Sequence, residues 1–355
     1  MHPHGVCLRY NLERSVIMEF RYIGKTGLRV SPICLGTMTF GAAIDKKEAF
    51  AVMDMAYDAG INFFDTAEIY PVPPQVESVG ITEEIVGEWL RTKNRDSVII
   101  ATKVAGAANG WFVPPIRSGL TAIDAHHINR AVEGSLKRLK VDYIDLYQMH
   151  WPDAIVPKEE SMEAFDRLVQ SGKVRYLGTS NDTAYGTTKA NMVCECHGYK
   201  RFESIQNNFS LLNRRFLDEM VQMCRQEKIS LLPYSPMAGG VLSGKYNKDL
   251  HTSGRFTRYI NSPDVRVQKM ADRFLNDKTL ASTARYMEIA ADLSIAPATL
   301  AIAWSKQFDF VASTIVGTNS CKQLAESLAA LELELSAETL ARCDKVHSEI
   351  LYPMG

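Results

Sequence analysis

Residues 61–70 read INFFDTAEIY, and this stretch decides the fold. An apolar run ends in Asp65, and Tyr70 follows five positions later. A run of this kind is typical of a buried strand in a parallel sheet, whose last residue emerges at the rim of the sheet. We therefore expect a strand that ends at Asp65, followed by a loop that carries Tyr70.

Two later runs repeat this pattern. Residues 98–103 end in Lys103, and residues 143–150 end in His150. If the three runs are parallel strands of one sheet, their C-terminal ends lie at the same rim. The sequence therefore predicts that Asp65, Lys103 and His150 meet there, with the tyrosine above them.

These four residue types together form a proton-transfer site. A free tyrosine has a pKa of about 10, which is too high for efficient proton transfer near pH 7. A lysine ammonium beside the phenol favours the phenolate, so we expect Lys103 to lower the pKa of Tyr70. Asp65 would hold the lysine in place, and His150 would tune the group or orient a substrate carbonyl. Each residue alone is an ordinary polar residue at a strand end, so the prediction rests on all four.

Apolar runs and amphipathic patterns alternate along most of the chain. Strands are predicted near residues 33–36, 61–65, 98–103, 143–149, 174–179, 203–207, 229–234 and 311–316. Helices are predicted near residues 46–59, 82–92, 126–139, 161–171, 185–197, 214–227, 279–306 and 320–331. Eight strands, each followed by a helical segment, indicate an α/β fold of the (β/α)8 type, the TIM barrel.

A doubly wound sheet is the alternative fold. Such a sheet normally carries the turn Gly-x-Gly-x-x-Gly after its first strand. The corresponding turn in this chain, residues 36–41, reads GTMTFG and lacks that fingerprint. The barrel is therefore favoured.

In their local contexts the four polar residues resemble the Asp-Tyr-Lys-His tetrad of the aldo-keto reductases. Residues 70–74 (YPVPP) and 254–259 (GRFTRY) are similar to the bacterial Tas-like branch of that family. The resemblance extends from about residue 20 to residue 353. It implies a barrel, the cofactor NADP(H), and an active site built by long loops at the C-terminal face.

The N-terminal part of the resemblance begins with a short hairpin. Residues 20–30 alternate around Lys25-Thr26-Gly27, which is typical of two short antiparallel strands, and in the family such a hairpin closes the bottom of the barrel. No segment has the composition of a linker, so we expect one domain over residues 18–355. Residues 1–17 are expected to be a disordered N-terminal extension.

Three predicted loops are longer than simple connections require, namely residues 70–81, 104–124 and 235–277. Long loops in a compact domain are usually functional. We expect Trp111 of the second loop, with Trp151, to form an apolar substrate pocket beside the tyrosine and the histidine of the tetrad. The third loop is expected to close over the cofactor.

A Gly-x4-Gly-Lys pattern ends at Lys245 and nearly matches the P-loop of nucleotide triphosphatases. The next residue is Tyr246, where that loop needs a Ser or Thr hydroxyl for magnesium, so we reject an ATPase. A glycine-rich backbone with a nearby lysine can still hold a pyrophosphate through its N–H groups.

The resemblance also implies the residues that hold the cofactor. In the family, the residue matching Tyr234 stacks on the nicotinamide, and those matching Ser180, Asn181 and Gln206 bind its carboxamide, for which they supply donors and acceptors. Without the resemblance, helix capping and a strand-end amide explain these last three equally well. The other implied contacts are Gly36, Thr37, Met38, Asp65, Ser235, Pro236, Met237, Ala238, Gly239, Lys245, Arg255, Arg258, Gly317, Thr318, Asn319, Gln323, Glu326 and Ser327.

The last predicted strand leads through Gly317 into a helix, and a helix N-terminus after such a turn is an anion site. The family binds the adenosine phosphate there. The best-known members have Lys at Gly317, Arg at Gln323 and Asn at Ser327, so this chain lacks two cationic ligands. We expect Arg255, or Arg258 in its place, to replace them from the third long loop, and NADPH to be preferred over NADH.

Composition excludes several other classes of protein. The chain has 355 residues, 46% apolar and 23% charged, and a net charge of −1, so it has no basic footprint for nucleic acid. No apolar run approaches the roughly 18 residues that span a bilayer. Seven cysteines without regular spacing indicate reduced thiols in the cytoplasm. No metal is expected, because residues 194–197 (CECH) lack a second ligand pair and His126-His127 fits a helix start capped by Asp124.

The sequence thus predicts an NADPH-dependent carbonyl reductase in which the cofactor supplies a hydride and Tyr70 protonates the oxygen of an aldehyde or ketone. The alternative is a non-catalytic, redox-sensing subunit like the potassium-channel β subunits of the same superfamily. Those generally lack the catalytic histidine, so His150 favours an enzyme. A lyase with a Schiff base on Lys103 would leave the cofactor loops at Tyr234 and Gly317 unexplained. Neither the physiological substrate nor the oligomeric state follows from the sequence.

Overall fold

The computed structural model describes residues 18–108 and 113–354. Eight parallel strands form one sheet in the order β10-β3-β4-β5-β6-β7-β8-β9. They are β3 (Ile33–Gly36), β4 (Phe63–Asp65), β5 (Ile99–Val104), β6 (Ile144–Met149), β7 (Val174–Ser180), β8 (Phe202–Gln206), β9 (Ser230–Leu231) and β10 (Thr314–Gly317).

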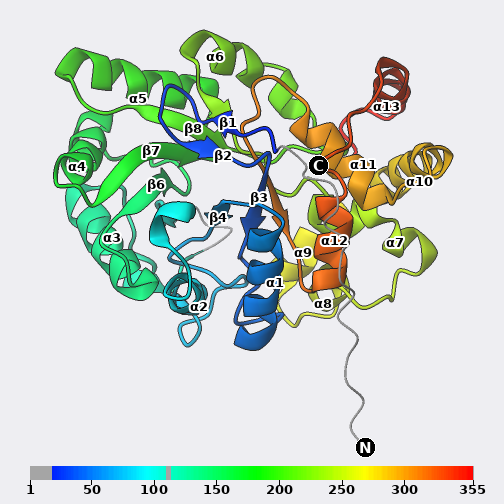
Figure 1. Cartoon of the computed structure of the whole chain (residues 1–355), viewed down its shortest axis with the longest axis horizontal. Helices are drawn as coiled ribbons and strands as arrows, with labels where there is room; N and C mark the ends of the chain where they lie inside the picture. The colour runs from blue at the N-terminus through cyan, green and yellow to red at the C-terminus, as the bar shows by residue number, and fades with distance from the viewer. Residues whose placement is uncertain (1–17, 109–112, 355) are drawn as a thin grey trace, which may run out of the picture.

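The sheet closes on itself between its two outer strands. Leu231 of β9 pairs with Val311 just before β10, and Ala312 donates its N–H to the carbonyl of Leu231 at 3.1 Å. Figure 1 shows the strands as a ring surrounded by helices. The predicted α/β barrel is confirmed, and each of the eight predicted strands is present.

The helices alternate with the strands along the chain. Those that follow the first six barrel strands and the last one are α1 (Lys46–Asp58), α2 (Ile81–Leu90), α3 (Ala125–Leu139), α4 (Lys158–Gln170), α5 (Ala184–His197), α6 (Met220–Glu227) and α12 (Cys321–Leu328). Between β9 and β10 lie α7 (Lys245–Lys248), α8 (Arg255–Ile260), α9 (Val265–Phe274), α10 (Asp277–Asp292) and α11 (Pro297–Lys306), and α13 (Ala337–Glu349) follows α12. Short 3-10 turns are η1 (Arg95–Ser97), η2 (Ile116–Gly119), η3 (Arg215–Leu217) and η4 (Ala238–Ser243).

Polar side chains at the starts of the helices explain where several of them begin. Asp45 accepts the N–H of Glu48 at the start of α1, and Thr183 accepts that of Gly186 at the start of α5. Asp124 accepts the N–H of His127, so the predicted cap of α3 is present. Each such bond satisfies a backbone donor that has no partner within its helix.

Two predictions for the region after β9 were wrong. The helix predicted at 279–306 is two helices, α10 and α11, which are bent by 94° relative to each other. Ser294 takes a left-handed conformation with φ 54° between them, and Pro297 starts the second helix, where its missing N–H is harmless. The loop predicted at 235–277 contains η4, α7, α8 and α9, whose four to ten residues are too few for a clear helical period.

Among the described residues, no single helix is long and apolar enough to cross a membrane. The bent pair α10 and α11 meets that test only together, by length and composition.

A hairpin covers the N-terminal end of the barrel, as predicted. Its strands are β1 (Arg21–Tyr22) and β2 (Arg29–Val30), which pair antiparallel. The N–H of Gly24 donates to Ser230 Oγ of β9 at 2.9 Å, and the N–H of Lys25 donates to Glu203 Oε2 of β8 at 2.9 Å. Apolar side chains of the hairpin pack into the barrel interior, which is therefore filled from below: Ile23, Leu28 and Val30 join Cys34, Phe63, Ala101, Leu146, Leu232, Ala312 and Ile315.

Candidate active site

The C-terminal ends of β4, β5 and β6 bring together the polar residues predicted from the three apolar runs. Lys103 is fully buried, and its Nζ donates to Asp65 Oδ1 at 2.5 Å and to the carbonyl of Thr66 at 2.7 Å. The Tyr70 hydroxyl lies 3.5 Å from the same ammonium. The rings of Tyr70 and His150 meet edge to face, with centroids 5.8 Å apart. The four predicted residues thus form one cluster.

The charges of this cluster follow from burial and proximity. Burial lowers the pKa of Lys103, but Asp65 and then Tyr70 raise it by more, so its pKa lies above the ordinary value. Burial, together with the nearby Lys103 charge, holds the pKa of His150 well below its usual range. At neutral pH the lysine is therefore a cation and the imidazole is neutral. His150 Nδ1 is buried and has no hydrogen-bond partner among the described residues.

The tyrosine differs from its sequence-based prediction. Burial raises the pKa of Tyr70 by more than the Lys103 ammonium lowers it, and the Asp65 carboxylate opposes the lysine as well. The net result is a pKa above that of free tyrosine, where a lowered one was expected. The expectation considered only the charge of Lys103. Tyr70 is only 8% exposed, and this removal from water raises the pKa of its phenol. Tyr70 is accordingly protonated at neutral pH.

A chain of amide and hydroxyl groups links the cluster to the neighbouring strands. Gln206 Nε2 donates to Asp65 Oδ2 at 2.9 Å, and Ser180 Oγ donates to the Gln206 carbonyl at 2.7 Å. Asn181 Nδ2 donates to the His150 carbonyl at 2.9 Å, and its Oδ1 accepts the Tyr234 hydroxyl at 2.7 Å. The structure therefore brings the four predicted nicotinamide residues to the same rim as the tetrad.

The backbone is unusual at the predicted cofactor loops. Asn181, Ser235 and Ala238 have φ values of 55°, 54° and 47°, in the left-handed region that residues with a Cβ rarely adopt. Ser235 and Ala238 belong to the turn after β9, and Gly239 and Gly240 in the same turn have φ of 66° and 101°. Conformations of this kind cluster at binding sites, where the surrounding structure holds them in place. Within this turn the N–H groups of Ala238 and Gly240 donate to the carbonyls of Ser235 and Met237, at 2.8 and 2.9 Å.

Three cations gather beside this turn. The pKa of Lys245 is lowered by burial and then by the charges of Arg255 and Arg258. Gly254 allows this approach, because a Cβ there would lie 2.6 Å from Lys245 Nζ. Within residues 18–108 and 113–354 none of the three forms an ion pair with an acid. Like charges that have no acidic partner in the part of the chain that the structure describes have the chemistry of an anion site.

The predicted adenosine-phosphate segment lies next to the first barrel strand. Gly317 of β10 is the parallel partner of Gly36 of β3. The turn after β10 is braced internally, because Gln323 Oε1 accepts the Asn319 N–H at 3.0 Å and Thr318 Oγ1 donates to the Ser320 carbonyl at 2.9 Å.

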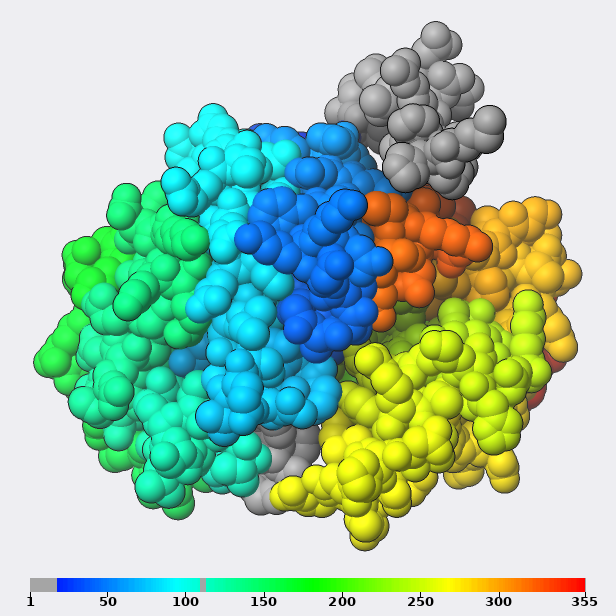
Figure 2. All heavy atoms as spheres, turned by 90° about the horizontal axis from the view of Figure 1, so that it is seen from below, coloured from blue at the N-terminus to red at the C-terminus, as the bar shows by residue number. Residues whose placement is uncertain are grey.

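Two further predicted residues of this segment, Glu326 and Ser327, lie in the last turn of α12. Ser327 is buried and donates to its own helix, whereas Glu326 is exposed. Figure 2 shows α12 on the same face as α1 and the yellow segment that contains α8 and α9.

The remaining predicted cofactor residues near the first barrel strand, Thr37 and Met38, follow the C-terminal end of β3 and contact the tetrad region. Thr37 donates both its N–H and its hydroxyl to the Asp65 carbonyl, at 3.0 and 2.9 Å. Met38 packs against the apolar cluster that includes Tyr70. Of the seventh strand's loop, Pro236 is buried and Met237 packs against the core outside the barrel.

An apolar wall surrounds the tyrosine. Trp151 belongs to the same packed cluster as Tyr70, and its ring lies 4.8 Å from that of His150. The indole N–H donates to the carbonyl of Ala107 in the loop after β5. The predicted pocket residue Trp111 lies outside the described residues. Trp151 is thus placed beside the tetrad as predicted, and the prediction for Trp111 stays a prediction.

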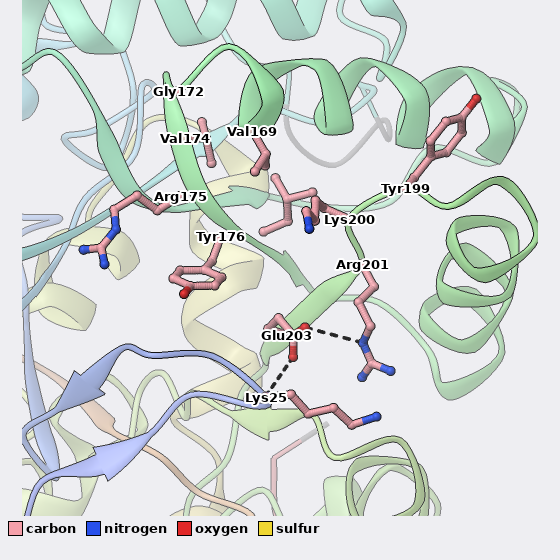
Figure 3. A pocket seen from close by; sticks show the side chains of 11 residues that line it. Lys25, Val169, Gly172, Val174, Arg175, Tyr176, Tyr199, Lys200, Arg201 and Glu203 are labelled. Atoms are coloured by element: carbon pink, nitrogen blue, oxygen red, sulfur yellow. Dashed lines mark hydrogen bonds and ion pairs between the residues drawn. The ribbon is translucent and has the colours of Figure 1, made fainter.

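A separate pocket of about 640 Å³ lies at the other end of the barrel (Figure 3). Lys25, Arg175, Tyr176, Arg201 and Glu203 are among its lining residues. Its arginines are paired, since Arg201 lies 3.7 Å from Glu203 and Arg175 is bound to a buried aspartate. It holds none of the predicted site residues and is not the candidate active site.

Sequence reasoning missed two contributors to the site. Gln148 Nε2, near the C-terminal end of β6, donates to Asp65 Oδ2 at 3.1 Å. Its position two residues before His150 puts both on the same face of the strand, so the period of two could have found it. Glu68 lies within the opening stretch between Asp65 and Tyr70, and its buried carboxylate binds Arg117 at 2.8 Å.

Comparison with known proteins agrees with this geometry. The model of the Aldo/keto reductase family matches residues 32–348. Protein tas of Escherichia coli (strain K12) is 36% identical over 363 residues, covering 95% of this chain and 99% of that protein. The Uncharacterized oxidoreductase YrpG of Bacillus subtilis (strain 168) is 36% identical over 325 residues, covering 91% and 94%. A probable voltage-gated potassium channel subunit beta of Oryza sativa subsp. japonica is 33% identical over 326 residues, covering 89% and 92%. Because these matches extend over almost the whole barrel, the chain belongs to the aldo/keto reductase family of oxidoreductases, with bacterial Tas-like proteins among its relatives.

Proposed function

We propose that this protein reduces aldehydes and ketones to alcohols with NADPH, and that Tyr70 is the general acid. The observation that carries the proposal is the buried Lys103 ammonium, held by Asp65 and placed 3.5 Å from the Tyr70 hydroxyl. NADPH would supply the hydride to the carbonyl carbon, and the protein supplies position and charge.

The charge states of the cluster suit the reductive direction. Tyr70 is protonated at neutral pH and has a proton to give to the developing alkoxide. The adjacent Lys103 cation stabilises the phenolate that remains, because opposite charges at this distance attract strongly in a buried site. The neutral His150 can donate a hydrogen bond to the substrate oxygen and so orient it for proton transfer. General acid catalysis of this kind contributes on the order of 10²–10⁴ in rate.

The residues present fit a nicotinamide dinucleotide. Tyr234 has the aromatic face for stacking, and Ser180, Asn181 and Gln206 supply the polar groups for the carboxamide. The left-handed turn from Ser235 to Gly240 and the Lys245 side chain fit a pyrophosphate.

Arg255 and Arg258, which have no anionic partner among the described residues, fit the additional phosphate of NADPH. They would replace the cations that other family members have at Gly317 and Gln323. We therefore propose NADPH, not NADH, as the preferred cofactor.

A second candidate is a redox-sensing subunit that binds NADPH without turning over a substrate. The rice relative, a probable voltage-gated potassium channel subunit beta, motivates it. His150 argues against it, because its neutral ring lies against Tyr70 where an enzyme needs a donor for the carbonyl oxygen.

The test is NADPH oxidation with a panel of aldehydes, ketones and quinones, beside cofactor binding measured by fluorescence. We expect the parent protein to turn over at least one class of carbonyl. Tyr70→Phe should bind NADPH normally and reduce the same substrate on the order of 10²–10⁴ more slowly. Binding of NADPH without oxidation by any carbonyl in the panel would favour the sensor. Full activity of Tyr70→Phe would place the acid elsewhere.

A further inference from the structure

The buried carboxylate of Glu68 joins the two loops that flank the site. Glu68 is 2% exposed and lies in the chain between Asp65 and Tyr70. Its Oε1 accepts the N–H of Ala105 at 2.8 Å and a hydrogen bond from Arg117 Nη2 at 2.8 Å. One carboxylate oxygen thus ties the tyrosine-bearing loop to two points in the loop after β5.

Arg117 is held in a conformation that its own backbone disfavours. Arg117 and Ser118 have φ values of 49° and 57°, in the left-handed region. The second partner of Arg117 is His127 at the start of α3, whose Nε2 lies 2.8 Å from Nη2. Burial, then the charge of Arg117, lowers the pKa of His127 to about 4, so the ring is neutral. Its Nε2 accepts from Arg117 in the tautomer protonated at Nδ1, and donates to the Ala105 carbonyl at 3.0 Å in the other tautomer. Contacts from Glu68 and α3 together over-determine the position of Arg117.

The neighbour of Arg117 forms part of the wall around the acid. Ile116 packs against the cluster formed by Ala67, Ile69, Tyr70, Ala105 and Trp151. Any movement of Arg117 therefore moves Ile116 relative to the phenol.

A contribution to folding stability does not explain why Glu68 and Arg117 form a buried ion pair. Burial raises the pKa of Glu68 by more than Arg117 and the Ala105 N–H lower it. An acid whose pKa is raised on folding adds most stability below its unfolded pKa, near 4.5, and that stability is lost as pH rises through the folded value. Buried pairs of this kind can often be replaced by apolar residues without loss of stability.

We propose that Glu68 and Arg117 are positioning residues that fix Ile116 against Tyr70 and thereby set which carbonyl substrates fit. This inference rests on the proposed carbonyl reduction, which it deepens by assigning its substrate selectivity to an ion pair outside the tetrad. Among the described residues, the side chains of the pair form no hydrogen bond with a tetrad side chain, and the Glu68 backbone N–H donates to the Lys103 carbonyl at 3.3 Å.

The experiment compares Glu68→Gln, Arg117→Met and the double variant with the parent protein. For each, kcat/KM is measured for a bulky aromatic aldehyde and for a small aliphatic one, beside the dissociation constant of NADPH. We expect the ratio of the two kcat/KM values to change at least about 10-fold, since misplacement by about 1 Å can cost on the order of 10²-fold. The double variant should match the worse single variant, because the pair acts as a unit. NADPH affinity should stay within about twofold.

A matched control exists at the other end of the barrel. Asp145 is also buried, accepts the N–H of Ile100 at 3.0 Å and binds Arg95 at 2.6 Å. Asp145 also binds Arg175 at 2.8 Å, so Asp145→Asn should perturb the fold at least as much as Glu68→Gln does, yet leave the selectivity ratio unchanged. Equal changes of the ratio in both variants, or no change in either, would overturn the proposal.

Hydrogen exchange gives a readout that does not depend on turnover. We expect exchange at the Ala105 amide to accelerate in Arg117→Met and in Glu68→Gln but not in Asp145→Asn. If the parent protein lacks carbonyl reduction, the proposed function fails, while this measurement still tests the loop contact. Unchanged exchange at Ala105 in both loop variants would refute the positioning role.

Discussion

Replacing Lys103 by methionine separates the structural and chemical roles of the tetrad. Methionine has a similar length and no charge, so the substitution removes the ammonium that bridges Asp65 and Tyr70. Asp65 then remains buried, and among the described residues the amides of Gln148 and Gln206 are its side-chain donors. The exposed fractions of the lysine and aspartate side chains are 0% and 3%, so solvent does not screen their interaction.

The expected loss of stability follows from this burial. Breaking a buried pair by removing one partner typically costs about 3–5 kcal/mol. The unfolding entropy of a chain this long is roughly 0.7 kcal/mol/K, so the melting temperature should fall by roughly 4–7 °C. The stabilisation also depends on pH. Because folding raises the pKa of Lys103, its contribution is full below the unfolded value of 10.5 and is lost as pH rises through the higher folded value.

A double variant distinguishes the two roles. Lys103→Met combined with Asp65→Asn removes the orphaned charge, so the melting temperature should recover most of the loss. The rate of single-turnover NADPH oxidation should stay on the order of 10²–10⁴ below the parent in both variants, because Tyr70 still lacks its cation. The assay is stopped-flow oxidation beside calorimetry. If the double variant recovers the parental rate together with its stability, the lysine acts only through the fold and our assignment is wrong.

Three further predictions concern the cofactor and the histidine. Arg255→Ala or Arg258→Ala, whichever residue binds the phosphate, should raise KM for NADPH about 10–150-fold and leave KM for NADH nearly unchanged. Equal effects on the KM values of both cofactors would contradict the phosphate role. Gly317→Lys with Gln323→Arg should tighten NADPH binding relative to NADH, because a Cβ at Gly317 would meet nothing within 4 Å, and calorimetric titration with both cofactors measures it. Burial holds the pKa of His150 well below 6.5, so kcat should show no loss from protonation of His150 between pH 8 and pH 6.5. A sigmoidal loss of kcat centred near pH 6.5 that is absent in His150→Asn would contradict this.

The sequence located the site because strand ends are easy to recognise. An apolar run that stops at one charged residue marks both the strand and its rim, and this pattern sufficed for Asp65, Lys103 and His150. The sequence could not yield the pKa of Tyr70, because the desolvation that raises it depends on how tightly Trp151 and neighbouring apolar groups surround the ring.

The region after β9 was the least predictable part of the fold. Its helices α7 and α8 have four and six residues, so no helical period develops, and the break at Ser294 carries no glycine to mark it. Glu68 was missed for a related reason. Its partners Ala105 and Arg117 are distant in sequence, and an acidic residue in a predicted loop is normally expected to be exposed to solvent.

The pairing of β10 with β3, and of the segment just before β10 with β9, has a consequence for biosynthesis. The strand that completes the ring is the last of the eight to leave the ribosome, so the preceding seven must wait with two open edges until it arrives. The pairing of Gly36 with Gly317 joins the first and last segments proposed to hold the nucleotide, and it forms only at that moment. A chain that terminates before Thr314 would lack the pairing of β10 with β3 and the segment proposed to hold the adenosine phosphate, and it would expose an unpaired edge at β3.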